Sequence, residues 1–170
     1  MSTTRRLGDS ATRRARRLAV VLALVGCTTP TRTAPSLPPA SDSAAIVVDV
    51  SFATDHPNIE KKEIGDHRIG GGPILSRGAV ISPVVFSLLR TVADRQSIPY
   101  SVHAAGRDTS TNADAIHIAR EGVATGLVSI PNRYMHSPNE LVSLEDVDRT
   151  ATLLAETCRE INDKTDFRAR

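Results

Sequence analysis

Apolar and polar positions alternate from about residue 44 onward in a way that predicts strands and helices in turn. The run 45–52 is apolar and rich in β-branched side chains apart from Asp49, which is typical of a buried strand in a parallel sheet. Polar stretches with turn residues separate this run from later apolar runs, so each run predicts an element of its own. Further strands are expected at 74–75, 98–104 and 125–130.

Helical periodicity appears between and after these strands. Ser82 and Pro83 are typical of an N-cap and a first helical position, and an apolar stripe follows them. A second helix is expected at 112–121. A final helix is expected after Ser143, with Asp146 placed nearly as in a capping box. Its predicted buried stripe is Leu144, Val147, Ala151, Leu154, Cys158 and Ile161. Strands that alternate with helices predict an α/β fold, a layered sandwich with a mostly parallel sheet.

The connecting segments are polar and carry most of the histidines. Residues 54–66 and 131–138 are expected to be loops, and the glycine triplet 70–72 is expected to be a turn. His56 and His67 lie in polar sequence and are predicted to be solvated, whereas His103 and His117 lie in predicted elements and are interpreted as structural.

Charge divides the chain into two unequal parts. The formal net charge is +2, but residues 1–43 contribute +5 and the remainder −3. A net charge this small does not favour a nucleic-acid partner. Residues 1–43 contain an arginine cluster, a short apolar run at 18–26, Cys27 and then a Pro/Thr/Ser-rich stretch.

Three interpretations of residues 1–43 are open. The segment resembles a bacterial lipoprotein signal in which Cys27 would be lipidated, and the apolar run is too short to span a bilayer. Alternatively, it is a spurious or remnant sequence produced by a misplaced start or a frameshift. An arginine-rich nucleic-acid arm is the third interpretation.

Two residues with metal-binding side chains are expected at the carboxyl ends of the strands, where such sheets bind ligands. Asp49 lies towards the end of the first strand, and His136 lies in the loop after residue 130. A carboxylate and an imidazole suit zinc, cobalt or manganese, although two ligands alone do not define a site.

Five segments in order resemble metallopeptidase family 42, the tetrahedral aminopeptidases, whose members include glutamyl aminopeptidases and proteins once described as endoglucanase M. The segments are AIVVDVSFATDHP (45–57), GGGP (70–73), IPY (98–100), ADAIH (113–117) and GVATGLVSIPNRYMHS (122–137). The resemblance implies a zinc-dependent exopeptidase type of fold, present incompletely, with residues 44–170 as a partial catalytic domain.

The resemblance also implies roles for named residues. Asp49 would bind one of two divalent metals, zinc or cobalt, and His136 would bind the other. Arg133 and Tyr134 would line the site or bind substrate, and Asp55 and Pro57 would form the turn beneath it. The metals would activate a water that hydrolyses the N-terminal peptide bond, with a glutamate as general base.

The departures from the family pattern limit these expectations. The family's remaining ligands and its base come from a His-x-Asp motif, a bridging Asp and a Glu-Glu pair; neither His-x-Asp nor Glu-Glu occurs in these 170 residues. No catalytic residue is identified. The chain is therefore expected to be an inactive fragment of a cytoplasmic peptidase acting on peptides. The alternative is a degenerate or lipid-anchored, non-catalytic protein that reuses the fold. The family's homo-oligomeric assembly is not carried over.

Overall fold

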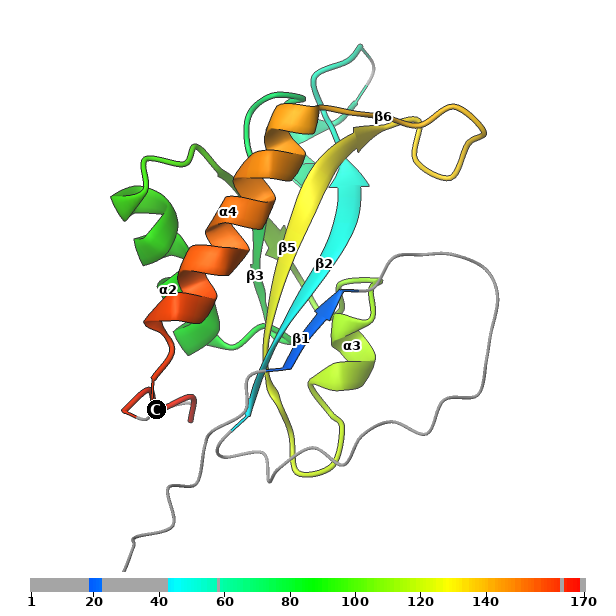
Figure 1. Ribbon diagram of the computed structural model, residues 1–170. Coiled ribbons are helices and arrows are strands. Elements are labelled where there is room, and N and C mark those ends of the chain that lie inside the picture. The colour runs from blue at the N-terminus through cyan, green and yellow to red at the C-terminus, as the bar shows by residue number, and fades with distance from the viewer. Residues whose placement is uncertain (1–18, 23–42, 58, 163, 169–170) are drawn as a thin grey trace, which may run out of the picture.

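The computed structural model describes residues 19–22, 43–57, 59–162 and 164–168, which form one mixed sheet with helices on both faces (Figure 1). The strand order is β1-β2-β5-β3-β4. β6 also pairs with β5, beyond the point where the first residue of β3 pairs with it. Within the described residues, three strand pairs are parallel and two, β3 with β5 and β5 with β6, are antiparallel. The strands are β1 (Ala19–Leu22), β2 (Ala44–Phe52), β3 (Ile74–Gly78), β4 (Ser101–Ala105), β5 (Ala124–Arg133) and β6 (Leu141–Val142).

The longest ladder joins β2 and β5. Their parallel register runs without interruption from Ala44 beside Ala124 to Phe52 beside Asn132. The strands predicted at 45–52 and 125–130 are thus confirmed. β5 continues to Arg133, into the segment predicted to be a loop, because Asn132 and Arg133 also pair with β6 on their other side. β4 begins at Ser101, three residues later than predicted, because Pro99 precedes it without an N–H to donate.

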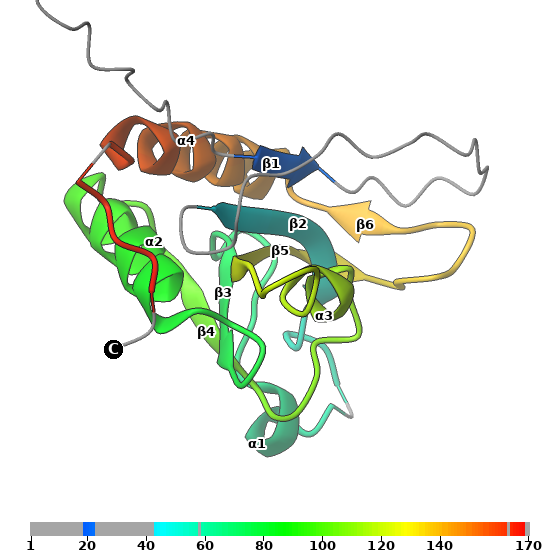
Figure 2. The ribbon, with the colours of Figure 1, turned by 90° about the horizontal axis from the view of Figure 1, so that it is seen from below.

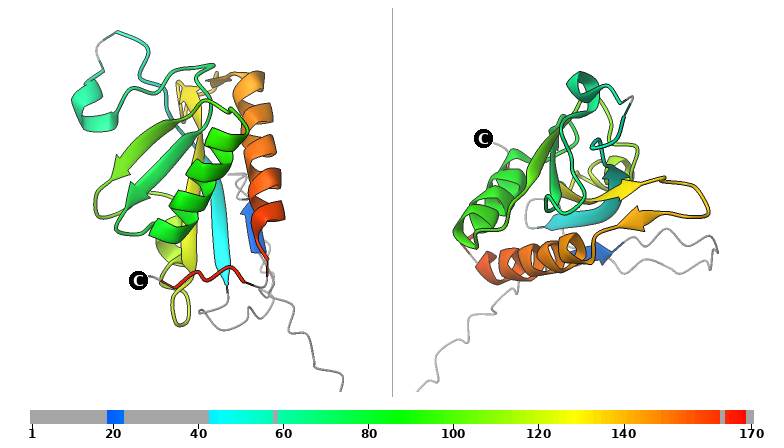
Figure 3. Two further views of the ribbon diagram at one scale, coloured as in Figure 1. Left: turned by 90° about the vertical axis from the view of Figure 1, so that its left-hand side faces the viewer. Right: turned by 90° about the horizontal axis from the view of Figure 1, so that it is seen from above.

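Two long helices cover one face of the sheet. α2 (Pro83–Arg95) and α4 (Leu144–Glu160) lie side by side there, as Figure 3 shows. Ser82 caps α2 as predicted, accepting a hydrogen bond from the Val85 N–H. Close packing of α2 on β5 depends on Gly126, where an added Cβ would stand 2.5 Å from Cγ1 of Val85. The core on this face includes the fully buried side chains Ile46, Val85, Leu89, Val92, Val128 and Leu153.

Two short helices differ from what the sequence predicts. α3 is only Ala113–Ile116, on the opposite face of the sheet (Figure 2), and not the helix expected over 112–121. Asn112 provides no side-chain cap for it, and Arg120 just beyond it has a positive φ of 56°. α1 (Lys61–Ile64) is a single turn within the predicted loop, where the Glu60 side chain accepts a hydrogen bond from the Lys62 N–H.

The predicted apolar run of the N-terminal segment is partly described. Ala19–Leu22 forms β1 and pairs with the first half of β2, from Ala45 to Val48. The rest of the segment, Cys27 included, lies outside the described residues, so the signal interpretation stays a prediction. Among the helices that the structure describes, none combines the length and the apolar character needed to cross a membrane.

Asp146 is the residue whose role differs most from its prediction. The side chain of Ser143 makes no capping hydrogen bond to α4. Instead Asp146, fully buried, accepts hydrogen bonds from the Gly70 N–H (2.7 Å) and the Gly72 N–H (2.8 Å). Gly72 is required there, because an added Cβ would lie 1.8 Å from the Pro99 carbonyl oxygen. The glycine turn is therefore fixed to the first turn of α4.

This anchor shifts the buried face of α4 away from the predicted stripe. The buried residues are Asp146, Thr150, Leu153 and Thr157, three of them polar. Leu144, which was predicted to begin the stripe, is 78% exposed, while Leu154 and Ile161 are only partly buried against the core. The predicted helix is confirmed, but the predicted face is wrong because a polar contact sets its orientation.

Replacing Asp146 with Ala is expected to lower the free energy of unfolding by about 3 kcal/mol, because the buried Gly72 N–H and the part-buried Gly70 N–H lose a charged acceptor. Urea denaturation of the two proteins measures the difference. Asp148→Ala is the matched control: this carboxylate lies two residues along the same helix on the exposed side, so the change should stay within about 0.5 kcal/mol. Equal effects at both positions would contradict the anchoring role.

Candidate metal centre

Asp49 and His136 lie at the same end of the sheet but do not form a cluster. Asp49 stands on β2 three residues before the strand ends, beside Ser129 of β5, and its Oδ1 accepts a hydrogen bond from the Val50 N–H (2.8 Å). His136 is exposed in the turn that follows β5. Because β2 and β5 are parallel, both residues belong to the carboxyl end of this ladder, the upper end in Figure 1. The described residues include no group of three or more His, Cys, Asp or Glu side chains that could hold a metal ion.

The chemistry of the two side chains fits one ligand each. Asp49 is half-buried and takes part in none of the ion pairs between described residues; the ring of His136 likewise forms no hydrogen bond within the described part of the chain. A carboxylate oxygen and an imidazole nitrogen thus remain able to coordinate a divalent cation. Their assignment as ligands stays a prediction.

Arg133, which was predicted to line the site, forms a two-point contact with Asp55. Arg133 Nε donates to Asp55 Oδ1 (3.0 Å), and its Nη2 lies 2.8 Å from Oδ2. The Ile69 N–H also donates to Oδ2 (3.2 Å). The guanidinium lowers the pKa of Asp55, and the carboxylate raises the pKa of Arg133. Arg133 therefore joins the end of β5 to the turn after β2 and to the segment that leads into the glycine turn.

Tyr134, the second residue predicted to line the site, begins an unusual turn. Its side chain is 65% exposed, and its φ is 62°, in the left-handed region; His136 has a φ of 64°. Non-glycine residues adopt this region rarely, so two such residues within three consecutive positions mark a turn that is held by other contacts. An open hollow of about 440 Å³ lies within the turn and is lined by Tyr134, Met135, Ser137, Pro138 and Asn139.

Sequence reasoning missed Glu140, the residue that contacts this turn most directly. Its carboxylate accepts hydrogen bonds from Asn132 Nδ2 (2.7 Å) and from the His136 N–H (2.6 Å). These two donors lower the pKa of Glu140. The only signal in the sequence is an acid four residues after His136, at the end of a short polar loop, which is too common to single out.

The prediction that His67 is solvated is wrong. His67 is fully buried, with Nδ1 2.8 Å from Ser101 Oγ and Nε2 2.9 Å from the Ile64 carbonyl oxygen. Since a carbonyl only accepts, Nε2 carries the proton and Nδ1 accepts from the serine hydroxyl. His103 Nδ1 donates to the same carbonyl (3.0 Å), and the two rings meet edge to face. Both histidines are therefore structural. The sequence predicted this role for His103 but not for His67.

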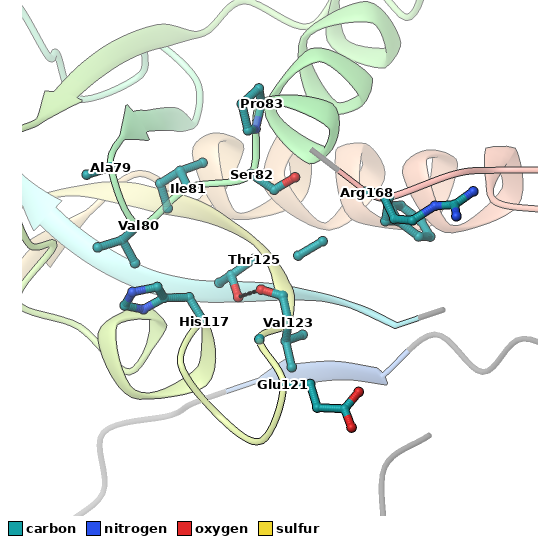
Figure 4. A pocket seen from close by; sticks show the side chains of 13 residues that line it. Ala79, Val80, Ile81, Ser82, Pro83, His117, Glu121, Val123, Thr125 and Arg168 are labelled. Carbon is teal, nitrogen blue, oxygen red and sulfur yellow. Dashed lines mark hydrogen bonds between the residues drawn. The ribbon is translucent and has the colours of Figure 1, made fainter. Parts of the chain in front are cut away.

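A second, open pocket of about 510 Å³ lies at the opposite end of the β2–β5 ladder. Figure 4 shows its wall, which includes Val80, His117, Glu121, Thr125 and Arg168. The Thr125 hydroxyl donates to the Val123 carbonyl, and the His117 ring lies within hydrogen-bonding distance of the Ala113 carbonyl. The Thr125 hydroxyl and the His117 ring thus serve the local backbone, and neither Asp49 nor His136 lines this pocket.

Fold and site together define the class: an α/β domain of the layered type with candidate ligands beyond the carboxyl ends of a parallel strand pair. Comparison with known proteins then gives the family. Residues 31–153 match the model of the M42 glutamyl aminopeptidase family, and the chain belongs to that family.

Individual relatives agree with this assignment. The chain is 42% identical over 108 residues to the lysyl aminopeptidase of Pyrococcus furiosus, a match that covers 64% of this chain and 30% of the relative. An aminopeptidase structure from the archaeon Desulfurococcus kamchatkensis superposes with a TM-score of 0.64 at 32% identity, covering 70% of this chain and 34% of that one. A TET aminopeptidase from a marine sediment archaeon of the Thaumarchaeota gives a TM-score of 0.64 at 26% identity, covering 72% and 34%. The chain thus spans about a third of the length of the relatives it matches.

The buried His67 predicts a loss of stability in acid. Burial, the first cause, and the neighbouring His103 lower its pKa below the ordinary value of 6.5, whereas the Ile64 carbonyl and Asp66 oppose the shift. As the pH falls below 6.5, the unfolded chain therefore takes up a proton that the folded chain resists, and folding is disfavoured. Urea midpoints measured from pH 7.5 to 5 should fall, and they should fall less steeply in His67→Gln. His56→Gln, which changes an exposed ring, should keep the wild-type slope; an unchanged slope in His67→Gln would contradict this account.

Proposed function

We propose that this chain supplies part of the active site of a metal-dependent aminopeptidase, which removes residues from the N-terminus of peptides. The observation that supports this most is the position of Asp49 and His136 at the carboxyl end of the β2–β5 ladder, in a chain of the M42 family. Within the described part of the chain, Asp49 Oδ2 and the His136 ring make no hydrogen bond. In such enzymes a pair of divalent metals, here zinc or cobalt, supplies an activated water for hydrolysis of the peptide bond.

The chain's own residues would divide the work as follows. Asp49 would hold one metal and His136 the other. Arg133, held by Asp55, would fix the loop that carries His136, and the exposed ring of Tyr134 would line the approach for the peptide. Peptides are the proposed substrates, and the cytoplasm is the proposed location; anchoring through a lipidated Cys27 is the alternative.

The residues of this chain provide one ligand for each metal and no general base that we can assign. Proton transfer by a positioned carboxylate and a metal held at several points are both needed for rapid hydrolysis. We therefore propose that these 170 residues act only together with the remaining parts of a family catalytic domain, and that by themselves they do not turn over substrate.

Metal affinity tests the ligand assignment. Calorimetric titration of the 170-residue protein with Zn²⁺ or Co²⁺ should show only weak binding, because one protein ligand per metal leaves most of the coordination to water. Asp49→Asn and His136→Gln should each remove one of the two weak sites, and the double variant should remove both. Glu121→Gln and His117→Gln, which change an acid and a histidine at the opposite end of the ladder, should bind like the wild type. Tight binding of two metals, or binding indifferent to Asp49 and His136, would refute the assignment.

Activity tests the proposed role in catalysis. The 170-residue protein should hydrolyse aminoacyl reporter substrates only at the background rate with Co²⁺ or Zn²⁺ present. A fusion of residues 44–170 behind the preceding part of the Pyrococcus furiosus relative should show chelator-sensitive turnover, and Asp49→Asn in that fusion should reduce it at least about 100-fold. Robust turnover by the 170-residue protein, or a fusion indifferent to Asp49, would count against the proposal; a folded but inactive fusion would favour a non-catalytic protein.

A further inference from the structure

The turn that carries His136 holds a backbone conformation that its own sequence does not favour. Tyr134 and His136 both have φ near +60°, and neither is glycine. Such residues persist where surrounding contacts determine their conformation. Within the turn, the Ser137 N–H donates to the Tyr134 carbonyl (3.0 Å), which closes the chain locally but leaves the His136 N–H to another acceptor.

That acceptor is Glu140, and Glu140 is in turn bound to the sheet. One carboxylate oxygen accepts from the His136 N–H at 2.6 Å, and the other accepts from Asn132 Nδ2 at 2.7 Å. Asn132 is only 1% exposed, and its backbone carbonyl oxygen accepts a hydrogen bond from the Ala53 N–H (2.9 Å). The carboxylate thus bridges a rigid position in the ladder and the exposed turn.

The polypeptide on either side of this bridge is also fixed. Leu141 and Val142, which follow Glu140 directly, pair with Arg133 and Asn132 as β6 and β5. The negative charge of Glu140 sets the orientation of the Asn132 side-chain amide. Its Oδ1 is buried without a hydrogen-bond partner among the described residues. Turning the amide over would place that oxygen against the Glu140 carboxylate, where the Nδ2 group now donates. An unpaired buried acceptor is costly, so the bond to Glu140 outweighs it.

We infer that Glu140 is a positioning residue that, through Asn132, holds the backbone of His136 and so limits the positions that its imidazole can take beyond the carboxyl end of the ladder. The functional meaning of this bridge rests on the proposed function, since it is the proposed metal ligand that is held. The bridge itself is a property of the turn and can be measured without metal or substrate.

Amide hydrogen exchange of the 170-residue protein, followed by NMR, tests the bridge. In Glu140→Ala the His136 amide should exchange about tenfold faster, because it loses a charged acceptor. In Glu140→Gln it should stay protected, because the side-chain carbonyl can accept from the His136 N–H. The new amide then faces Asn132, whose own amide must turn over so that its Oδ1 accepts the hydrogen bond. Glu121→Ala, which removes an exposed carboxylate near the opposite end of the ladder, is the matched control and should leave His136 unchanged.

The amide of Val128, in the buried middle of β5, reports whether the variants remain folded. Unchanged exchange at His136 in Glu140→Ala would overturn the inference, as would an equal acceleration at Val128 or in Glu121→Ala. A Co²⁺ titration of the same samples, read at the His136 ring resonances, reports on the proposed function separately: its failure in the wild type would remove the metal assignment and leave the exchange result standing.

Discussion

The structure depends on the parallel ladder between β2 and β5. Nine consecutive register pairs join two strands that are far apart in sequence. The remaining elements pack around these strands: α2 and α4 lie on one face and α3 on the other. β3 and β6 pair one after the other with the side of β5 that faces away from β2. Because the ladder is parallel, it brings the two carboxyl ends to one edge. The loops after β2 and after β5 are therefore neighbours, although about eighty positions separate them.

Carboxylates hold the segments together at that edge. Asp55 binds the Arg133 guanidinium and the Ile69 N–H, Asp146 binds two N–H groups of the glycine turn, and Glu140 binds Asn132 and the His136 N–H. Each satisfies donors that irregular backbone would otherwise leave unpaired, and hydrogen bonds to a charged acceptor are the stronger kind. Asp49 differs from these three, since its only hydrogen bond to the residues that the structure describes joins it to its neighbour Val50. The contrast separates supporting carboxylates from one that remains available for coordination.

The sequence predicted the elements of the fold better than their contacts. Strands at 45–52 and 125–130 and the helices after Ser82 and Ser143 follow from periodicity and capping, which are local properties. The partners of Asp146 lie more than seventy residues away in the chain, and Ser101 lies 34 residues from His67, so no local pattern announces either contact. The predicted strand ends pointed to Asp49 and His136, and family resemblance supplied their roles as ligands. Glu140 contacts His136 because of the conformation of a turn, which residue types alone do not specify.

The extent of β1 has a consequence for the candidate centre. β1 covers the edge of β2 only as far as Val48, and Asp49 is the next residue. From Asp49 to Phe52, β2 has no strand on that side within the described part of the chain, and the Phe52 side chain is 45% exposed. A backbone segment added along this stretch would extend the sheet by main-chain hydrogen bonds and would pass directly beside the Asp49 carboxylate. Completion of the sheet and enclosure of the proposed ligand would then be a single event, with assembly itself deciding when the centre is shielded from bulk water.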